Sequence, residues 1–426
     1  MIVYLFIFMG VLILISAPIA VALGFSSLLV LEIGGVPLGI VVQRAFSGIN
    51  SFSLMAVPFF ILAGNIMQGG GIAKRLMSFA NVLVGWFKGG IAAATVLGTM
   101  FFSTMSGSSA ATTAAIGSIT IPNMTKKGYP KPFAAAVIAS SGELGVILPP
   151  SLALIMYGLA ANVSIGDLFL AGILPGIFVA LSMLATVIIV VKRKGYDEGE
   201  GIAKGQWLRQ AWLTFKSAIW TLIMPLIILG GIYSGYFTPT EAAVVAVVYG
   251  IFIGFVVHKE LTFKKLMNIF AESAITSGII LLIVAFSTVF GHILTINRVP
   301  HMIADFMLNI TESAIVFLII VNIMILITGM FMEALAAIII LAPILVPVAM
   351  QFGVDPVHFG IIMTVNFAIG MITPPLAVNL FVACQIARIR LAEIIPPVLI
   401  FLFVLLVDLV IITYVPAMST WIPSLQ

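Results

Sequence analysis

The sequence predicts an all-α polytopic membrane protein, in which two re-entrant helical hairpins and two broken helices form an inverted repeat. Three observations lead to this fold class. Of 426 residues, 62% are apolar and only 8% are charged, against about 25% charged in an average soluble domain. The 19 basic and 15 acidic residues gather in a few groups between long apolar stretches. Two of these stretches are flanked by opposite kinds of charge and share a pattern of glycine and proline.

This composition excludes a water-soluble globule, and it argues against both nucleic-acid binding and disorder. With about 20 residues per spanning helix, the apolar stretches could supply about ten to twelve crossings of the lipid bilayer. The single cysteine, Cys384, permits no intrachain disulfide and no thiol-based metal site. The N-terminal apolar run has no basic residue before it, so we expect the first spanning helix there rather than a signal peptide, with its end outside the cytoplasm.

Five groups of basic residues are predicted to face the cytoplasm under the positive-inside rule. They are Lys74, Arg75 and Lys88; Lys126, Lys127 and Lys131; the basic segment 192–216; Lys259, Lys264 and Lys265; and Arg388 and Arg390. The apolar segment 89–123 has lysines on both sides, so both of its ends should be cytoplasmic. Each half has about 15 residues and reaches about mid-bilayer. We therefore predict a first re-entrant hairpin with a serine-rich tip at 106–109.

A second hairpin is predicted at 313–351, broken near Thr328 and Gly329. Its flanks carry acidic residues and no lysine, so it should enter from the outside. An offset of 225 residues superimposes the glycine and proline pattern of the two regions: it pairs Pro122 with Pro347, Gly145 with Gly370, Pro149 with Pro374 and Pro150 with Pro375. The two regions are thus predicted to be an internal repeat, and the opposite flanking charge makes it inverted.

The remaining apolar stretches cross the membrane in alternating directions. They are 132–160, 168–191, 220–233, 242–257, 271–295, 357–387 and 396–414. Two further segments have one apolar helical face and are predicted to be interfacial helices rather than solvated linkers. Those faces are Ile72, Leu76, Phe79, Ala80 and Leu83, and Trp207, Leu208, Ala211, Trp212 and Phe215. The predicted parts are scaffold helices with an arm helix (1–88), repeat 1 (89–191), scaffold helices with a cytoplasmic loop and arm helices (192–311), repeat 2 (312–395) and a terminal helix (396–426).

Four breaks at one depth indicate a binding site, because irregular backbone within a membrane persists only where it is buried in protein or lines a wet cavity. Two breaks are the hairpin tips, and the others are the Pro-Pro segments 145–150 and 370–375. Tandem prolines free carbonyl groups that suit a dehydrated cation, and half-helix N-termini favour an anion. Inverted-repeat secondary transporters bind sodium and carboxylates in this way. The alternative is that the prolines only kink helices and the small residues only permit close packing.

Three charged residues within apolar surroundings are further candidates, since such charges are costly to insert. Glu143 and Glu333 could coordinate sodium, orient a tip or bind a proton, or they could only pair with a hydroxyl or a backbone N–H group. Arg298 could bind a substrate carboxylate with two hydrogen bonds, or it could mark an interfacial loop.

Four motifs in this order resemble the large membrane subunit of tripartite ATP-independent periplasmic (TRAP) transporters, over essentially the whole chain. They are GSSAATTAAIG (107–117), GELGVILPPS (142–151), GYFTPTEAA (235–243) and AIGMITPPLAVNLF (368–381). The resemblance implies an inverted-repeat elevator-type transporter of the bacterial inner membrane, importing sialic acid or a C4-dicarboxylate with Na⁺. It also implies a small four-helix membrane subunit and a periplasmic substrate-binding protein. Because the chain starts directly with its first long helix, we expect the small subunit to be a separate chain.

Carried over by position, the resemblance implies two Na⁺ sites. The first would use Ser103, Ser106, Ser108, Gly145, Leu148 and Pro149, and the second Thr328, Gly329, Met332, Gly370, Thr373 and Pro374. The anion is expected between them, facing Ser108, Ser109 and Thr112 more than the second tip, which lacks serine. We expect at least two Na⁺ per monoanion, which makes uptake electrogenic.

Three other functions are compatible with parts of this pattern. A stand-alone sodium/dicarboxylate elevator symporter would need no binding protein. An intramembrane serine protease would use Ser106 with a histidine, but the four histidines lie near the ends of predicted segments. An ion channel fits poorly, because paired tip hairpins suggest alternating access.

Overall fold

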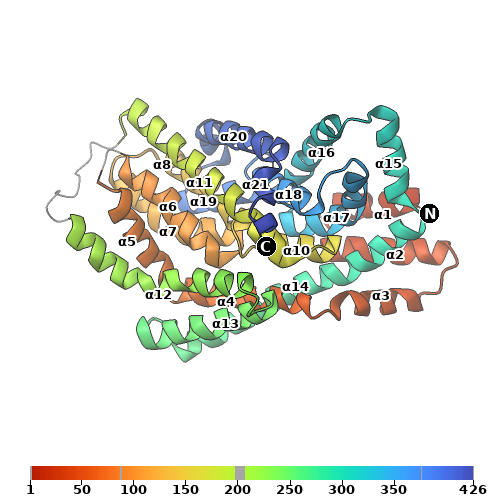
Figure 1. The fold of residues 1–426 in the computed structure, drawn as a ribbon, viewed down its shortest axis with the longest axis horizontal. Helices are drawn as coiled ribbons and strands as arrows, with labels where there is room; N and C mark the ends of the chain where they lie inside the picture. The colour runs from red at the N-terminus through yellow and green to blue at the C-terminus, as the bar shows by residue number, and fades with distance from the viewer. Residues whose placement is uncertain (1, 87–88, 197–206, 376, 426) are drawn as a thin grey trace.

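The computed structural model describes residues 2–86, 89–196, 207–375 and 377–425, and these residues form helices and turns without strands (Figure 1). Two predicted features fall outside the described residues: Lys88, a flank of the first hairpin, and the central part of the basic loop at 197–206. The all-α fold class is confirmed over the described chain.

Six of the described helices are long and apolar enough to cross a membrane, and up to eight spans result if each bent helix pair counts as one. One of the six is an arm of the predicted second hairpin, Ala334–Gln351. The number is below the predicted ten to twelve because several apolar stretches form half-length helices instead. The chain is a multi-pass membrane protein.

The N-terminal region differs from the prediction. The expected first spanning helix is α1 (Ile2–Leu14), which is followed by a turn at Pro18 and by α2 (Ile19–Ile33), which packs on it. At 1.5 Å per residue α1 is only about 20 Å long, less than the hydrocarbon thickness of about 30 Å. The residue before a proline disfavours helical backbone, which explains the break. Next come α3 (Gly39–Ile49) and α4 (Ala56–Gly69), bent by 65° around the 3₁₀ turn Ser53–Met55.

The first repeat contains the predicted hairpin and broken helix. The arm helix α5 (Ile72–Val84) precedes this repeat. The helices of the repeat are the hairpin arms α6 (Gly90–Ser106) and α7 (Ser109–Lys126), the broken helix α8 (Lys131–Ser141), α9 (Leu144–Ile147) and α10 (Leu152–Ala161), and α11 (Ile165–Lys194). The predicted arm helix is α5, which stands at an angle to α4 in Figure 1. Its apolar face is buried, and the Phe79 ring lies 6.0 Å from Phe101 on α6 and 5.7 Å from Phe215, between ring centroids.

Three scaffold helices follow: α12 (Trp207–Tyr233), α13 (Pro239–Phe252) with a π-helical turn Ile253–Val257, and α14 (Phe263–Ile296). The predicted interfacial helix at Trp207–Phe215 is not separate. It is the first part of α12, because no glycine or proline interrupts the chain before Pro225. The side chain of Leu208, a member of that predicted face, lies outside the described part.

The helix α15 (Val299–Ile310) precedes the second repeat, which contains the hairpin arms α16 (Ala314–Gly329) and α17 (Ala334–Gln351) and the broken helix α18 (Pro356–Gly370) and α19 (Val378–Ala387). The terminal helix α20 (Leu391–Tyr414) and the short α21 (Ala417–Thr420) follow it. Helix starts follow the offset found in the sequence. Ser109 begins α7 and Ala334 begins α17, 225 residues later, and the starts of α11 and α20, at Ile165 and Leu391, differ by 226.

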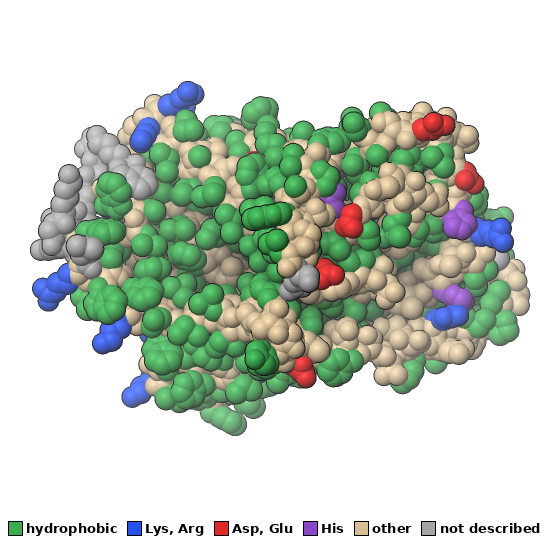
Figure 2. All heavy atoms as spheres, in the orientation of Figure 1, with side chains coloured by type: hydrophobic (Ala, Val, Ile, Leu, Met, Phe, Trp, Pro, Cys, Tyr) green, Lys and Arg blue, Asp and Glu red, His purple; other side chains and the backbone are tan. Residues whose placement is uncertain are grey.

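The two hairpins lie toward opposite ends of the molecule. Figure 1 shows α5, α6 and α7 toward one end and α15, α16 and α17 toward the other. On the face drawn in Figure 2, the charged side chains at the first end are Lys and Arg, whereas Asp and Glu lie toward the middle and the second end, where some Lys or Arg side chains are also visible. The absence of Asp and Glu from the first end of this face agrees with the expectation that the first hairpin enters from the cytoplasmic side.

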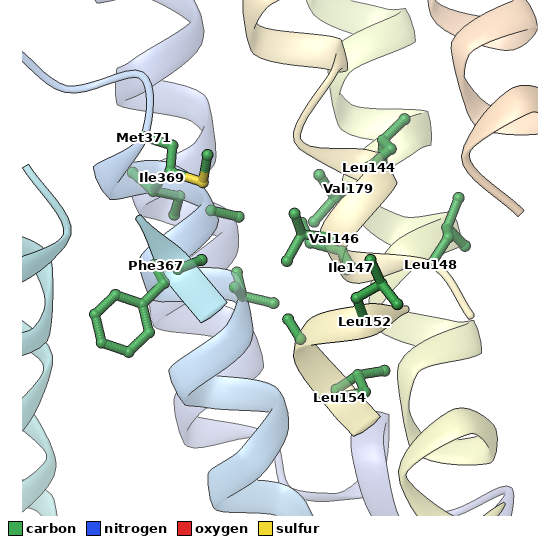
Figure 3. Close-up of a cluster of buried hydrophobic side chains, with 14 of the residues drawn as sticks. Leu144, Val146, Ile147, Leu148, Leu152, Leu154, Val179, Phe367, Ile369 and Met371 are labelled. Carbon is green, nitrogen blue, oxygen red and sulfur yellow. The ribbon is translucent and has the colours of Figure 1, made fainter. Parts of the chain in front are cut away.

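Both broken helices meet in the core. Figure 3 shows them side by side, with the buried side chains of Val146, Ile147 and Met371 in the layer between them. Packing also crosses between repeats, since α7 lies on α19 and α10 lies on α17. The hairpins and broken helices of both repeats therefore form one interlocked unit.

Candidate functional site

A cavity of about 410 Å³ separates the hairpin tips from the scaffold helices α4 and α14, a size typical of small-molecule sites. Hairpin 1 and α10 contribute Phe102, Ser106, Ser108, Ala111 and Leu152; the start of α17 contributes Glu333 and Leu335; α4 contributes Ile61, Gly64, Asn65 and Gln68; and α14 contributes Thr276, Ile279, Ile280 and Ile283. The lining residues combine apolar walls with hydroxyl and amide groups and one carboxylate. None of them is a lysine or an arginine.

The first tip is held by local hydrogen bonds. Gly107 ends α6 with a left-handed backbone (φ 63°), which glycine adopts without steric cost. Ser108 caps α7, because its Oγ accepts the Ala111 N–H at 3.4 Å, and Ser106 Oγ donates to the Ser108 carbonyl at 3.2 Å. The Leu152 N–H donates to the Gly107 carbonyl at 3.3 Å. The tip is thereby joined to the start of α10.

Gly145 brings the first broken helix against this tip. A Cβ atom at Gly145 would lie 2.6 Å from the Ser108 carbonyl oxygen and 2.6 Å from Thr112 Oγ1. Only glycine permits this approach. The structure therefore brings together three of the predicted positions, Ser108, Thr112 and Gly145.

Two hydroxyls near this tip, Ser103 Oγ and Thr112 Oγ1, are fully buried and make no hydrogen bond to the described residues. Unpaired buried oxygens are rare because each loses its hydration without compensation. Hydroxyl and carbonyl oxygens are the ligands that hard cations prefer. The oxygen donors of Ser103, Ser106 and Ser108 in the predicted first site thus fit Na⁺, whereas ligation at Leu148 and Pro149 stays a prediction.

The second tip has a different character. A Cβ atom on Gly370 would lie 2.7 Å from Gly329 Cα, so tip and broken helix meet through backbone. Thr373 Oγ1 donates to the Ile369 carbonyl at 2.7 Å and Thr328 Oγ1 to the Met324 carbonyl at 2.9 Å. Both hydroxyls retain lone pairs for a cation, but neither is orphaned. The predicted ligands Met332 and Pro374 are half-buried beside this contact.

Glu333 is the N-cap of α17. Its Oε2 accepts the N–H groups of Leu335 at 2.9 Å and Ala336 at 3.3 Å. Ser108 has the equivalent role 225 residues earlier, so an uncharged cap in repeat 1 corresponds to a carboxylate in repeat 2. Glu333 therefore pairs with backbone N–H groups, which is one of the alternatives predicted for it, and it also lines the cavity.

Three predicted substrate contacts do not reach the cavity. Ser109 is buried and its Oγ faces Met371 Sδ at 3.5 Å, and Thr112 is buried against Gly145. Arg298 is exposed in the turn after α14, about 20 Å along that helix from Ile283. Arg298 therefore does not line this cavity, because α14 continues past the cavity before the turn, and its contact with a substrate carboxylate stays a prediction.

The scaffold side of the cavity was not among the predicted sites. Asn65 and Gln68 lie on α4, and Asn65 Nδ2 donates to Ser273 Oγ on α14 at 2.8 Å. The sequence contains a signal for these two residues, because both are polar amides within an otherwise apolar run. Also not among the predicted site residues was Asn379, whose amide donates to the buried carboxylate of Glu143; this contact joins residues too far apart in the chain for any local pattern.

The protease arrangement is not formed. Ser106 Oγ donates to the Ser108 carbonyl, and none of the four histidines lines the cavity. The Nε2 atom of His358 instead lies 3.1 Å from the Thr413 carbonyl oxygen. Among the described lining residues, Ser106 therefore has no histidine beside it that could act as its base.

Comparison with known proteins gives a consistent result. Residues 6–418 match the family model described as "Tripartite ATP-independent periplasmic transporter, DctM component". The chain is 44% identical to the isethionate TRAP transporter permease protein DctMQ of Oleidesulfovibrio alaskensis, covering 97% of this chain and 65% of that relative. It is 42% identical to the C4-dicarboxylate TRAP transporter large permease protein DctM of Pseudomonas aeruginosa, covering 89% and 88%.

Two further likenesses complete the comparison. The sialic acid TRAP transporter large permease protein SiaM of Vibrio cholerae is 37% identical, covering 90% of this chain and 89% of SiaM. Among solved structures, the YdaH transporter of Alcanivorax borkumensis has a TM-score of 0.63 at 16% identity, covering 90% of this chain and 87% of YdaH. The last likeness concerns the fold alone.

Proposed function

The chain belongs to the DctM component family of tripartite ATP-independent periplasmic (TRAP) transporters, and from this premise we propose that it imports an organic acid together with Na⁺. Like its relatives, it is a transporter permease subunit and not an enzyme. Relatives named for C4-dicarboxylates are 40–42% identical and those named for sialic acid 37% identical. These are the two substrate classes to test first, with isethionate as the third.

One observation carries the proposal of sodium coupling: the cavity has a carboxylate but no basic side chain among its described lining residues. An organic anion there needs positive charge from another source. The N-terminus of α7 supplies about half a charge, and its cap Ser108 lines the cavity. A cation held by the first tip would supply a full charge beside the anion.

The first Na⁺ would be held by Ser103, Ser106 and Ser108 of the tip with the backbone at Gly145, Leu148 and Pro149. The second would be held by Thr328, Gly329 and Met332 with Gly370, Thr373 and Pro374. Bound Na⁺ supplies electrostatic stabilisation of the anion. The orphaned Ser103 hydroxyl and the glycine contacts support these assignments. The substrate would contact Ser106, Ser108, Asn65 and Gln68.

An elevator movement is the alternating-access mode that this packing favours. The hairpins and broken helices are joined by close backbone contacts, at Gly145 against Ser108 and at Gly370 against Gly329. The cavity, by contrast, lies on the boundary between this unit and the scaffold helices α4 and α14. Sliding of the unit along the scaffold would move the site across the membrane while the tips stay closed.

The tripartite description implies two partners, a small membrane subunit and a periplasmic substrate-binding protein that delivers the acid. The chain would then reside in the bacterial inner membrane, which borders the periplasm where the binding protein is located. A stand-alone symporter of similar architecture is the competing assignment, and dependence of uptake on added binding protein separates the two.

The test is uptake of succinate, sialic acid or isethionate into proteoliposomes that contain both membrane subunits, with candidate binding proteins added outside. We expect uptake to require an inward Na⁺ gradient and to increase when the interior is negative. Uptake that is equal with Na⁺ and with choline would contradict the proposal.

A further inference from the structure

A buried carboxylate links the two broken helices outside the tip sites. Glu143 lies between α8 and α9 of repeat 1, and Asn379 lies near the start of α19 in repeat 2. Both are 0% exposed, and Asn379 Nδ2 donates a hydrogen bond to Glu143 Oε1. This amide is the carboxylate's single hydrogen-bond partner among the described residues, and it is neutral.

Three oxygens at this contact lack partners. Glu143 Oε2, Asn379 Oδ1 and Thr113 Oγ1 are buried and accept or donate no hydrogen bond within the described chain. Thr113 belongs to α7 and lies directly over the neighbouring turn, since a Cβ atom on Gly142 would be 2.0 Å from its hydroxyl. Unpaired oxygens of Glu143 and Asn379 therefore lie at this contact, and the unpaired Thr113 hydroxyl lies beside the adjoining Gly142. Among the described residues no lysine or arginine forms an ion pair with this carboxylate.

The carboxylate is separate from the first tip site. Successive helical residues are rotated by about 100°, so Glu143 and Gly145 point about 200° apart. Gly145 faces Ser108 and Thr112, whereas Glu143 reaches Asn379 on the other repeat. The two groups thus lie on opposite sides of the broken helix.

An ionised carboxylate that is buried with one neutral donor is strongly disfavoured unless a positive charge compensates it. We propose that Glu143 Oε2 and Asn379 Oδ1, with the Thr113 hydroxyl, bind a third Na⁺. This inference rests on the proposed sodium-coupled function. A monovalent ion fits a site with a single carboxylate, because a divalent ion would leave an excess positive charge in the protein interior.

The test measures the number of ²²Na⁺ ions bound per chain at saturation, with both membrane subunits purified in detergent. Glu143→Gln preserves shape while removing the charge, and we expect it to bind one Na⁺ fewer than the wild-type protein. Asn379→Ala is the second variant, with the same expected loss. Asp408→Asn is the matched control, because Asp408 is also a buried carboxylate but is paired with Ser182 on α11; it should bind the full number.

An unchanged number of bound ions in both Glu143→Gln and Asn379→Ala would overturn the third site while leaving the sodium-coupled function intact. A loss in the Asp408→Asn control as well would show general damage and would also overturn it. A wild-type protein that binds no ²²Na⁺ would instead refute the proposed function itself. As a second readout, the rise in unfolding temperature with Na⁺ concentration should be smaller for Glu143→Gln than for the wild type.

Discussion

Replacing Gly145 with alanine tests the contact between the first tip and the first broken helix. The new Cβ would lie 2.6 Å from the Ser108 carbonyl oxygen and from Thr112 Oγ1, whereas ordinary contacts begin at 3.4 Å. Tip and helix must therefore separate by about 0.8 Å. Thr112 can rotate away, but the Ser108 oxygen belongs to the backbone and moves only with the tip. Overpacking of this kind costs about 1–3 kcal/mol.

A displacement approaching 1 Å lowers the efficiency of a preorganised site by up to about 100-fold. We expect Gly145→Ala to weaken Na⁺ binding at the first site about 10- to 100-fold, measured as the Na⁺ concentration for half-maximal uptake in proteoliposomes. Gly230→Ala in α12 is the matched control, since its Cβ would meet no atom within 4 Å. Wild-type Na⁺ dependence in a folded Gly145→Ala protein would refute the assignment of this contact to the sodium site.

Three further predictions concern single side chains. Glu333→Ala removes the cap of α17 and should lower stability by about 0.5–2 kcal/mol, seen as a lower unfolding temperature in detergent; an unchanged temperature would show that the cap contributes nothing. Arg298→Gln should leave the KM for substrate unchanged, because Arg298 is exposed away from the cavity; a large rise in KM would restore it as a substrate contact. For His258, which follows the π-helical turn, burial and then the nearby Arg75 charge lower its pKa below 6.5. As the pH falls, the unfolded chain therefore binds a proton at this histidine before the folded chain does. The histidine's contribution to the free energy of unfolding is thus full above about pH 6.5 and decreases below it. The unfolding temperature should fall less steeply from pH 7.5 to 5 in His258→Gln than in the wild-type protein, and equal slopes would contradict the lowered pKa.

The sequence predicted the membrane architecture where local chemistry determines it. Lysines at 126, 127 and 131 located the base of the first hairpin, and the tandem prolines at 149–150 and 374–375 located both breaks. These signals are local, because each proline removes a backbone hydrogen-bond donor at its own position and lysines near helix ends favour the cytoplasmic side of the membrane. The offset between the repeats followed from the same residues.

Side-chain direction and long-range pairing were not predictable in this way. Ser109 and Thr112 are near the tip in sequence, but the helical rotation of α7 turns both into protein rather than into the cavity. The Glu143–Asn379 contact joins residues 236 apart and forms only when both repeats pack together.

The division of the N-terminal apolar run at Pro18, by contrast, could have been predicted from the sequence, because the residue before a proline disfavours a continuing helix.

The inverted arrangement of the two hairpins underlies every site assigned above, and side-specific labelling tests it most directly. Lys126 and Gln351 end α7 and α17, are both exposed and differ by the repeat offset of 225. With the only native cysteine, Cys384, replaced by alanine, Lys126→Cys and Gln351→Cys each carry one thiol for an impermeant maleimide. We expect labelling of Lys126→Cys from the cytoplasmic side alone and of Gln351→Cys from the opposite side alone. Labelling of both from the same side would contradict the inverted arrangement.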